Sequence, residues 1–169
     1  MEAWHGGPEN FKHFDHVNFG KGERGREAGW GLYFSEFKPG GQWFTEQYFF
    51  SKGIPGFLYH VELEFNCSEI LSIDNPDDFP NKDAYSKASS IFPPRDQELT
   101  LRPAYTRSRL ILGEEEAAQG LKDIGIKVIH SGSQKKPTHG HSFIVIDHKI
   151  ITILNKFLFD QKGLTKLEV

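Results

Sequence analysis

The sequence predicts an α+β fold in a single domain spanning residues 1–169. Three observations support this class. Phe57–Phe65 alternates apolar and polar residues as a half-buried strand does, Ser142–Ile146 is a short apolar run typical of a strand buried on both faces, and Glu114–Gly125 has the composition of a helix. Since the strands lie far apart in sequence and few long helices are expected, they must be brought together in a strand-rich core.

The amino-terminal part is expected to hold two short strands, at Ala3–His5 and at Gly31–Phe34. Glycine punctuation separates them, and Gly20–Arg26 is predicted to be a flexible basic loop. Gly53–Gly56 is typical of a turn that leads into the alternating strand. In that strand Phe57, Tyr59, Val61, Leu63 and Phe65 share one face.

Prolines break up the middle of the chain. Asn75-Pro76 and Pro93-Pro94 lie within residues 66–112, where only short helices and loops are expected. The helix at 114–125 begins with three glutamates, which the helix dipole favours, and Gly125 ends it.

Three strands are predicted after this helix. They lie at Lys127–His130, at Ser142–Ile146 and, after a turn at Asp147–Lys149, at Ile150–Leu154. No internal repeat is present in the sequence.

Composition excludes several classes of protein. The net charge of −3 argues against a globally basic nucleic-acid binder. The single cysteine, Cys67, permits neither an internal disulfide nor a thiolate metal cluster. No apolar run reaches the roughly 20 residues that span a bilayer, and the amino terminus lacks the basic and apolar regions of a secretory signal. We therefore expect a cytoplasmic protein without a membrane partner.

Three blocks in the first fifty residues carry the functional signal. Trp4-His5-Gly6-Gly7 places an imidazole beside a backbone that a flat ligand can approach closely. Gly29–Phe34 places Tyr33 after two glycines, and Thr45–Tyr48 adds a second tyrosine. Together the blocks predict a slot for a planar group attached to a sugar.

These residues resemble the ADP-ribosyltransferase superfamily, in the branch with a His–Tyr–Glu signature that contains diphtheria toxin and the poly(ADP-ribose) polymerases. The likeness is greatest to small bacterial and phage-type members. It covers most of residues 3–65 and 114–154 and leaves 66–112 unaccounted for. The matching pieces, in order, are His5-Gly6, Phe11 and Phe14, Gly20–Glu23, Gly29–Phe34, Tyr48, Tyr59–Leu63, Ala117–Gly125 and Phe143–Leu154.

The resemblance implies a split pair of small antiparallel sheets with short flanking helices and an NAD cleft between the sheets. It implies that His5 hydrogen-bonds the adenosine ribose and that the backbone of Gly6, with Gly7 beside it, holds the nicotinamide carboxamide. Tyr33 and Tyr48 would stack on the nicotinamide ring, which as a pyridinium is attracted to aromatic faces. Thr45 is a further candidate for bonding the carboxamide.

One position departs from the family pattern. The glutamate that opens the late core strand and stabilises developing charge is replaced here by Ser142, with His141 just before it. The carboxylate that follows, Asp147, is expected at the far end of that strand, and Glu46 is an alternative source. The replacement predicts transfer of single ADP-ribose units rather than polymer formation.

The function expected from the resemblance is therefore mono-ADP-ribosylation. The chain would cleave NAD, release nicotinamide and transfer ADP-ribose to a protein or nucleic acid, with NAD as substrate and no metal. By analogy it would be an intracellular toxin or defence effector, from a toxin–antitoxin or phage-defence module, with a neutralising partner. The alternative is a catalytically inactive relative that binds NAD or a partner. The basic loop, with Lys21, Arg24 and Arg26, is either a contact for pyrophosphate or an anionic target, or solvated surface.

The sequence is also compatible with two rival sites in place of the NAD cleft, a zinc site and a glycosidase site. His139 and His141, flanked by His130 and His148, have the spacing for two zinc ligands on one strand face, without a further ligand at a diagnostic spacing. A two-carboxylate glycosidase would draw on acidic residues that nothing in the sequence pairs. These are Asp74, Asp77, Asp78 and Glu114–Glu116.

Overall fold

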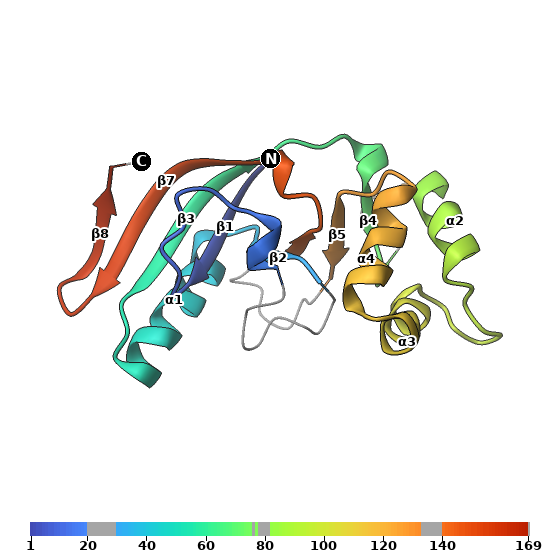
Figure 1. Ribbon diagram of the computed structural model, residues 1–169, viewed down its shortest axis with the longest axis horizontal. Coiled ribbons are helices and arrows are strands. Elements are labelled where there is room, and N and C mark those ends of the chain that lie inside the picture. Colours follow the sequence, from blue (N-terminus) through green and yellow to red (C-terminus); the bar gives the residue numbers. More distant parts are fainter. Residues whose placement is uncertain (20–29, 76, 78–81, 133–139, 169) are drawn as a thin grey trace.

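The computed structural model describes residues 1–19, 30–75, 77, 82–132 and 140–168. Within them the chain is α+β, as predicted, with a mixed sheet of eight strands in the order β4-β5-β6-β2-β1-β3-β7-β8 (Figure 1). The strands are β1 Glu2–Gly7, β2 Leu32–Ser35, β3 Gly56–Leu63, β4 Ile70–Ser72, β5 Val128–Ser131, β6 Ser142–Val145, β7 Ile151–Asp160 and β8 Gly163–Leu167. The helices are α1 Lys38–Lys52, α2 Lys82–Ile91, α3 Arg102–Leu112 and α4 Glu114–Asp123.

The central strand β3 matches its prediction closely. Tyr59, Val61 and Leu63 are buried on one face, with Phe57 and Phe65 packed at the margin of the same cluster. The opposite face is also covered, because Leu58 is fully buried against α1. β3 pairs with β1 over six positions and with β7 over eight, which makes this the most extensively paired part of the sheet.

Helix α1 was not predicted from the sequence. Lys38-Pro39-Gly40-Gly41 has the composition of a loop, yet Pro39 lies in the first turn of the helix, where its missing N–H costs nothing. Gly41 has its place because a Cβ there would lie 2.9 Å from the Cβ of Trp4. Gly41 thus lets the helix pack closely against β1.

Residues 66–112 contain the expected short helices, α2 and α3, and one strand that the sequence analysis missed. β4 has only three residues and pairs in parallel with β5, whereas every other registered pair in the described sheet is antiparallel. Such a short run carries too few residues for its periodicity to be read. At the other end of the chain, β7 is longer than predicted and turns into β8, which was also missed.

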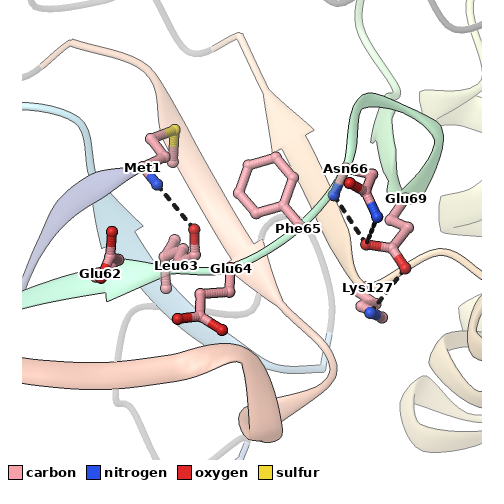
Figure 2. Close-up of a pocket in the computed structure, with 8 residues that line it drawn as sticks. All are labelled: Met1, Glu62, Leu63, Glu64, Phe65, Asn66, Glu69 and Lys127. Atoms are coloured by element: carbon pink, nitrogen blue, oxygen red, sulfur yellow. Dashed lines mark hydrogen bonds and ion pairs between the residues drawn. The ribbon is translucent and has the colours of Figure 1, made fainter.

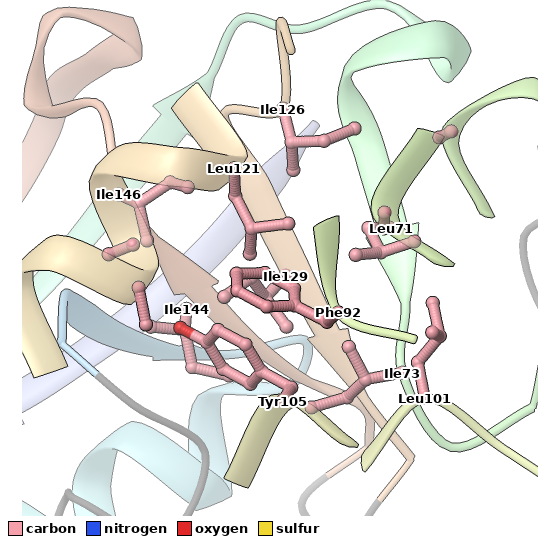
Figure 3. Close-up of a cluster of buried hydrophobic side chains, with 14 of the residues drawn as sticks. Leu71, Ile73, Phe92, Leu101, Tyr105, Leu121, Ile126, Ile129, Ile144 and Ile146 are labelled. Atoms are coloured by element: carbon pink, nitrogen blue, oxygen red, sulfur yellow. The ribbon is translucent and has the colours of Figure 1, made fainter. Parts of the chain in front are cut away.

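The sheet is covered on both faces. By the alternation of residues along the strands, α1 lies on the same face as α2, α3 and α4, which we call the helix face. The three later helices gather over β4 and β5 (Figure 1), where Leu71, Ile129, Ile144 and Leu121 form a buried cluster with Tyr105 (Figure 3). The opposite or loop face is covered by residues 8–19, whose Phe14 packs on Phe34 and Tyr59 and whose Phe19 belongs to the same buried cluster.

Among neighbouring strands of the described sheet, β1 and β2 share the fewest registered residue pairs. β1 and β2 have one registered pair, Trp4 with Ser35. By contrast β2 pairs with β6 over four positions. The structure therefore connects all eight strands in one mixed sheet, and the two separate antiparallel sheets that the resemblance implied are not found among the described residues. β1 and β2 are joined by a single registered pair.

Candidate functional site

The candidate site lies where the β1–β2 ladder stops. If the ladder continued, Gly6 would face Tyr33, because antiparallel partners step in opposite directions from Trp4 and Ser35. Instead the Tyr33 carbonyl takes a hydrogen bond from Nδ1 of His5 at 2.7 Å. The alternation of the strand directs the N–H and C=O of Gly6 toward the same edge as those of Trp4. One donor and one acceptor of the main chain thus point to the place where the two strands part.

The imidazole of His5 is half-buried among aromatic rings on the loop face. Its ring centroid lies 5.3 Å from that of Phe14, 5.4 Å from Phe34 and about 6 Å from Phe11 and Tyr59. The Tyr59 hydroxyl holds part of this wall in place, since it donates to the Glu9 carbonyl at 2.8 Å and accepts from the Phe11 N–H at 2.6 Å.

This environment fixes the protonation of His5. Burial lowers its pKa from 6.5, and the hydrogen bond to Tyr33 offsets this only in part, so the ring is neutral near pH 7. A carbonyl can only accept, so the proton of the neutral ring lies on Nδ1. Nε2 consequently carries a lone pair. It is an acceptor suited to a hydroxyl group.

Gly6 and Thr45 lie on the helix face, directly against each other. A Cβ on Gly6 would be 1.9 Å from the Gly41 carbonyl oxygen and 2.5 Å from Oγ1 of Thr45. Thr45 is fully buried, and its hydroxyl lies 3.1 Å from the Gly41 carbonyl and 3.2 Å from the Phe57 carbonyl. Thr45 therefore positions α1 against β1 and β3, and its hydroxyl already has main-chain partners.

The side chain of Tyr33 leaves β2 on the helix face, opposite to His5. It packs against the buried cluster beneath α3 and α4 and lies close enough to Tyr105 to contribute to raising the pKa of that phenol, after burial itself. Tyr105 is 1% exposed, and its hydroxyl has no hydrogen-bond partner among the described residues. His5 and Tyr33 are thus adjacent through the Tyr33 carbonyl, while their rings lie on different faces of the sheet.

Tyr48 is one turn beyond Thr45 on α1. Its ring lies under the ammonium of Lys52, which is 5.5 Å from the ring centroid. Gly6, by comparison, meets α1 at Gly41 and Thr45. The structure therefore brings His5, Gly6, Thr45 and the Tyr33 main chain together, and it records no contact of Tyr48 with them in the described part of the chain.

Ser142, where the resemblance implies a glutamate, lies one strand further along the sheet, in β6. Ser142 pairs with Ser35 and also with Ser131. His141 lies in a chain of side-chain contacts: its Nδ1 is 2.8 Å from Nε2 of His130, whose Nδ1 is 2.9 Å from the hydroxyl of Ser72. His130 and Ser72 are buried, so the side chains that position His141 belong to the interior of the protein.

A carboxylate also lies at this position, contrary to the sequence analysis. Glu36, directly after β2, accepts a hydrogen bond from the His141 N–H at 3.0 Å and donates its own N–H to the His141 carbonyl at 2.9 Å. Glu46, the alternative carboxylate named from the sequence, instead accepts a hydrogen bond from the side-chain amide of Gln42 at 2.6 Å. Glu36 was missed because it follows a strand that is distant in sequence, and only the β2–β6 pairing brings it to His141.

The rival sites are not assembled as the sequence suggested. His139 lies outside the described residues, as do Asp78 and the basic loop with Lys21, Arg24 and Arg26. His148 lies apart from the His130–His141 pair, beside His16. For the glycosidase, Asp74 forms an ion pair with Arg102, and Glu114 pairs with Arg109 at 2.9 Å.

A pocket of about 370 Å³ lies elsewhere, at the carboxyl end of β3 and near the amino terminus (Figure 2). The Met1 ammonium donates to the Leu63 carbonyl at 2.9 Å, and Lys127 pairs with Glu69 at 2.7 Å. Glu62 and Glu64 add further negative charge. None of the site residues predicted from the sequence lines this pocket.

Comparisons with protein-family models, with curated proteins and with solved structures find no match to this chain. In the described part of the chain, no helix is long and apolar enough to cross a membrane.

Proposed function

We propose that the chain is a mono-ADP-ribosyltransferase that uses NAD as its substrate. The observation that carries the proposal is the end of the β1–β2 ladder. There the main-chain N–H and C=O of Gly6 point away from β3, toward the side on which β2 would otherwise pair, and the neutral imidazole of His5 lies beside them. A carboxamide needs one donor and one acceptor at fixed spacing, which a strand edge supplies.

In this proposal Nε2 of His5 accepts a ribose hydroxyl, and Gly6 holds the nicotinamide carboxamide. The bond between nicotinamide and the ribose breaks, and its electron pair neutralises the pyridinium. A nucleophile of the acceptor then forms a bond to the same ribose carbon from the opposite face and releases its proton. Tyr33 and Tyr48 remain proposed contacts of NAD, with Gly7 as part of the closely approached backbone. Thr45 is not proposed as a contact, because its buried hydroxyl already has main-chain partners.

The second part of the proposal concerns charge stabilisation. Ser142 and His141 occupy the position of the family's glutamate, and Glu36 is the carboxylate that the structure adds beside them. Losing one stabilising contact raises a barrier by on the order of 3–4 kcal/mol, which is compatible with slow transfer of single units. We expect Glu36→Gln to lower the rate of NAD cleavage about tenfold, equivalent to about 1.4 kcal/mol. Glu46→Gln, the matched control, should leave the rate unchanged, and equal rates for both variants would exclude Glu36.

The acceptor is proposed to be a protein or a nucleic acid, and the setting a cytoplasmic toxin or defence effector with a neutralising partner. Incubating the chain with labelled NAD and a cell lysate tests this directly. Treatment with protease or nuclease before detection identifies the polymer that carries the label. His5→Ala should abolish labelling. Label that persists in this variant would contradict the proposed site.

An inactive, NAD-binding relative is the second candidate, and one observation favours it: four aromatic rings surround His5, as they would a purely structural histidine. Calorimetric titration with NAD, combined with measurement of nicotinamide release, separates the two. Heat of binding without release supports the binding module. Release that depends on His5 supports the transferase, and neither heat nor release would contradict both.

A further inference from the structure

A second group of potential ligand atoms lies away from the β1–β2 join. Asp15, His16 and His148 place one carboxylate and two imidazoles so that their ligand atoms all lie within 4.8 Å of one another. In the described residues, no other set of three histidine, cysteine, aspartate or glutamate side chains meets this condition. The three residues come from two segments that are more than 130 positions apart in the sequence, so the fold itself creates the group.

The geometry of the group is close to that of a small metal site. Nδ1 of His16 lies 2.5 Å from Oδ1 of Asp15, and the ring centroids of His16 and His148 are 5.7 Å apart. In a tetrahedral zinc site the ligand atoms are about 3.4 Å apart, which follows from bond lengths of about 2.0–2.1 Å. All the ligand atoms lie within 4.8 Å of one another, so no separation exceeds the zinc value by more than about 1.4 Å, whereas His16 and Asp15 would have to move apart by about 0.9 Å. The His16 side chain is 64% exposed, which leaves room for it to rotate.

The surroundings hold one side of the group in place. Phe19 is buried and its ring lies edge-on to His148 at 6.2 Å and to Trp30 at 4.6 Å. His148 begins a 3₁₀ turn, η3 (His148–Ile150), which the Asp147 side chain caps by accepting from the Lys149 N–H. Asp147 is therefore engaged as a cap, and Asp15 is the carboxylate available to a cation at this place.

We propose that Asp15, His16 and His148 bind a divalent cation of the zinc class, with water completing the coordination. Imidazole nitrogen and carboxylate oxygen suit Zn²⁺, and three protein ligands with one open position are a recognised zinc arrangement. The zinc site weighed from the sequence used His139 and His141, flanked by His130 and His148, and shares only His148 with this group. The bound ion would connect η1 (His16–Asn18) to the turn after β6. The proposal does not depend on transferase activity.

The test uses the full chain without a histidine tag, freed of metal with a chelator. Titration with Zn²⁺ by calorimetry, and with Co²⁺ by visible absorption, gives the affinity and the ligand geometry. We expect one equivalent to bind, with tetrahedral-type Co²⁺ absorption and a rise in melting temperature. His148→Asn and Asp15→Asn should each weaken binding at least tenfold.

His13→Asn is the matched control, because His13 is an exposed neighbour in sequence that does not belong to the group. It should bind Zn²⁺ as the wild type does. Circular dichroism of each variant without metal establishes that the fold is intact. The proposal is overturned if the wild type binds no Zn²⁺, if His148→Asn binds as tightly as the wild type, or if His13→Asn weakens binding equally.

Discussion

Two histidines on the same face of the sheet show what an intact ladder and an interrupted one do to a side chain. His130 belongs to β5, which pairs on both sides, and its ring nitrogens lie within hydrogen-bond distance of Ser72 and His141. His5 belongs to β1, whose pairing with β2 stops after one position, and it bonds to a main-chain carbonyl that a ladder would otherwise use.

The two imidazoles differ in whether both ring nitrogens have a partner among the described residues. In the intact region the side chains satisfy one another, and His130 is fully buried. At the interruption, His5 Nδ1 takes the place of a main-chain donor, and Nε2 keeps its lone pair. The break in this ladder thus ends the pairing between the two main chains and fixes the tautomer of the histidine beside it.

The largest expected effect comes from replacing His5 by a ring that cannot accept a hydrogen bond. His5→Phe keeps an aromatic side chain among Phe11, Phe14 and Phe34, and should lower nicotinamide release by about 10²–10³, or roughly 3–4 kcal/mol of barrier. His130→Ala should keep its rate within tenfold at temperatures where it is folded. If the two variants lose activity equally, the contrast between the two regions is wrong.

The free energy of unfolding should show the reverse order, with the larger loss in His130→Ala. His130→Ala opens a cavity in a fully buried place and leaves Ser72 without its partner, so we expect a loss of about 2–4 kcal/mol in the free energy of unfolding. Urea unfolding followed by circular dichroism measures this. Ser72→Ala, which removes one hydroxyl, should cost about 1 kcal/mol. A cost below that of Ser72→Ala would show that His130 is not the centre of the chain of contacts.

Gly6→Ala tests how closely β1 packs against α1 at the point where the β1–β2 ladder stops. The added methyl would meet the Gly41 carbonyl and Thr45, and α1 must move away from β1 to admit it. Overpacking of this kind typically costs about 1–3 kcal/mol. Thermal unfolding gives the cost, and Gly53→Ala, where open space surrounds the site at a positive φ, serves as a comparison for strain without a clash. A melting temperature for Gly6→Ala above that of Gly53→Ala would contradict the close packing.

The smallest effect is a dependence of stability on pH. The pKa of His5 is lowered from 6.5 in the folded chain, so below about pH 6.5 the unfolded state binds a proton that the folded state does not. Stability contributed by neutral His5 is therefore present above pH 6.5 and falls as the pH drops toward the folded pKa. The slope reaches at most about 1.4 kcal/mol per pH unit.

Unfolding midpoints between pH 7 and pH 5 check this expectation. The slope should be smaller in His5→Phe than in the wild type and unchanged in His13→Gln, which alters an exposed histidine. Parallel slopes for the wild type and His5→Phe would show that His5 does not titrate differently in the two states.

The sequence predicted elements where one face is buried and the run is long. β3 and α4 were found for this reason, since Tyr59, Val61 and Leu63 alternate and Glu114–Glu116 favour a helix start. α1 was missed because Gly40 and Gly41 are poor helix formers, and the role of Gly41 appears only when Trp4 is packed against it. β4 was missed because three residues carry too little pattern.

The site shows the same limit. The pattern indicated His5 and Gly6, whose chemistry is local, but the partner of His5 is the carbonyl of Tyr33 rather than its ring. Glu36 reaches His141 only through the β2–β6 pairing, and Asp15 reaches His148 only in the folded chain. Residues that long-range strand pairing brings together have no characteristic separation in the sequence. A sequence pattern therefore could not predict these contacts.

The pairing of β2 has a consequence for the order of folding. β1, α1 and β3 are complete within the first 63 residues, whereas the four-position partner of β2 is β6, which begins at Ser142. Closing so long a loop is entropically costly, and contacts of this range form slowly. We therefore expect amide protection during refolding to arise first in β1 and β3 and last in β2. Pulse-labelled hydrogen exchange that found β2 protected as early as β3 would refute this order.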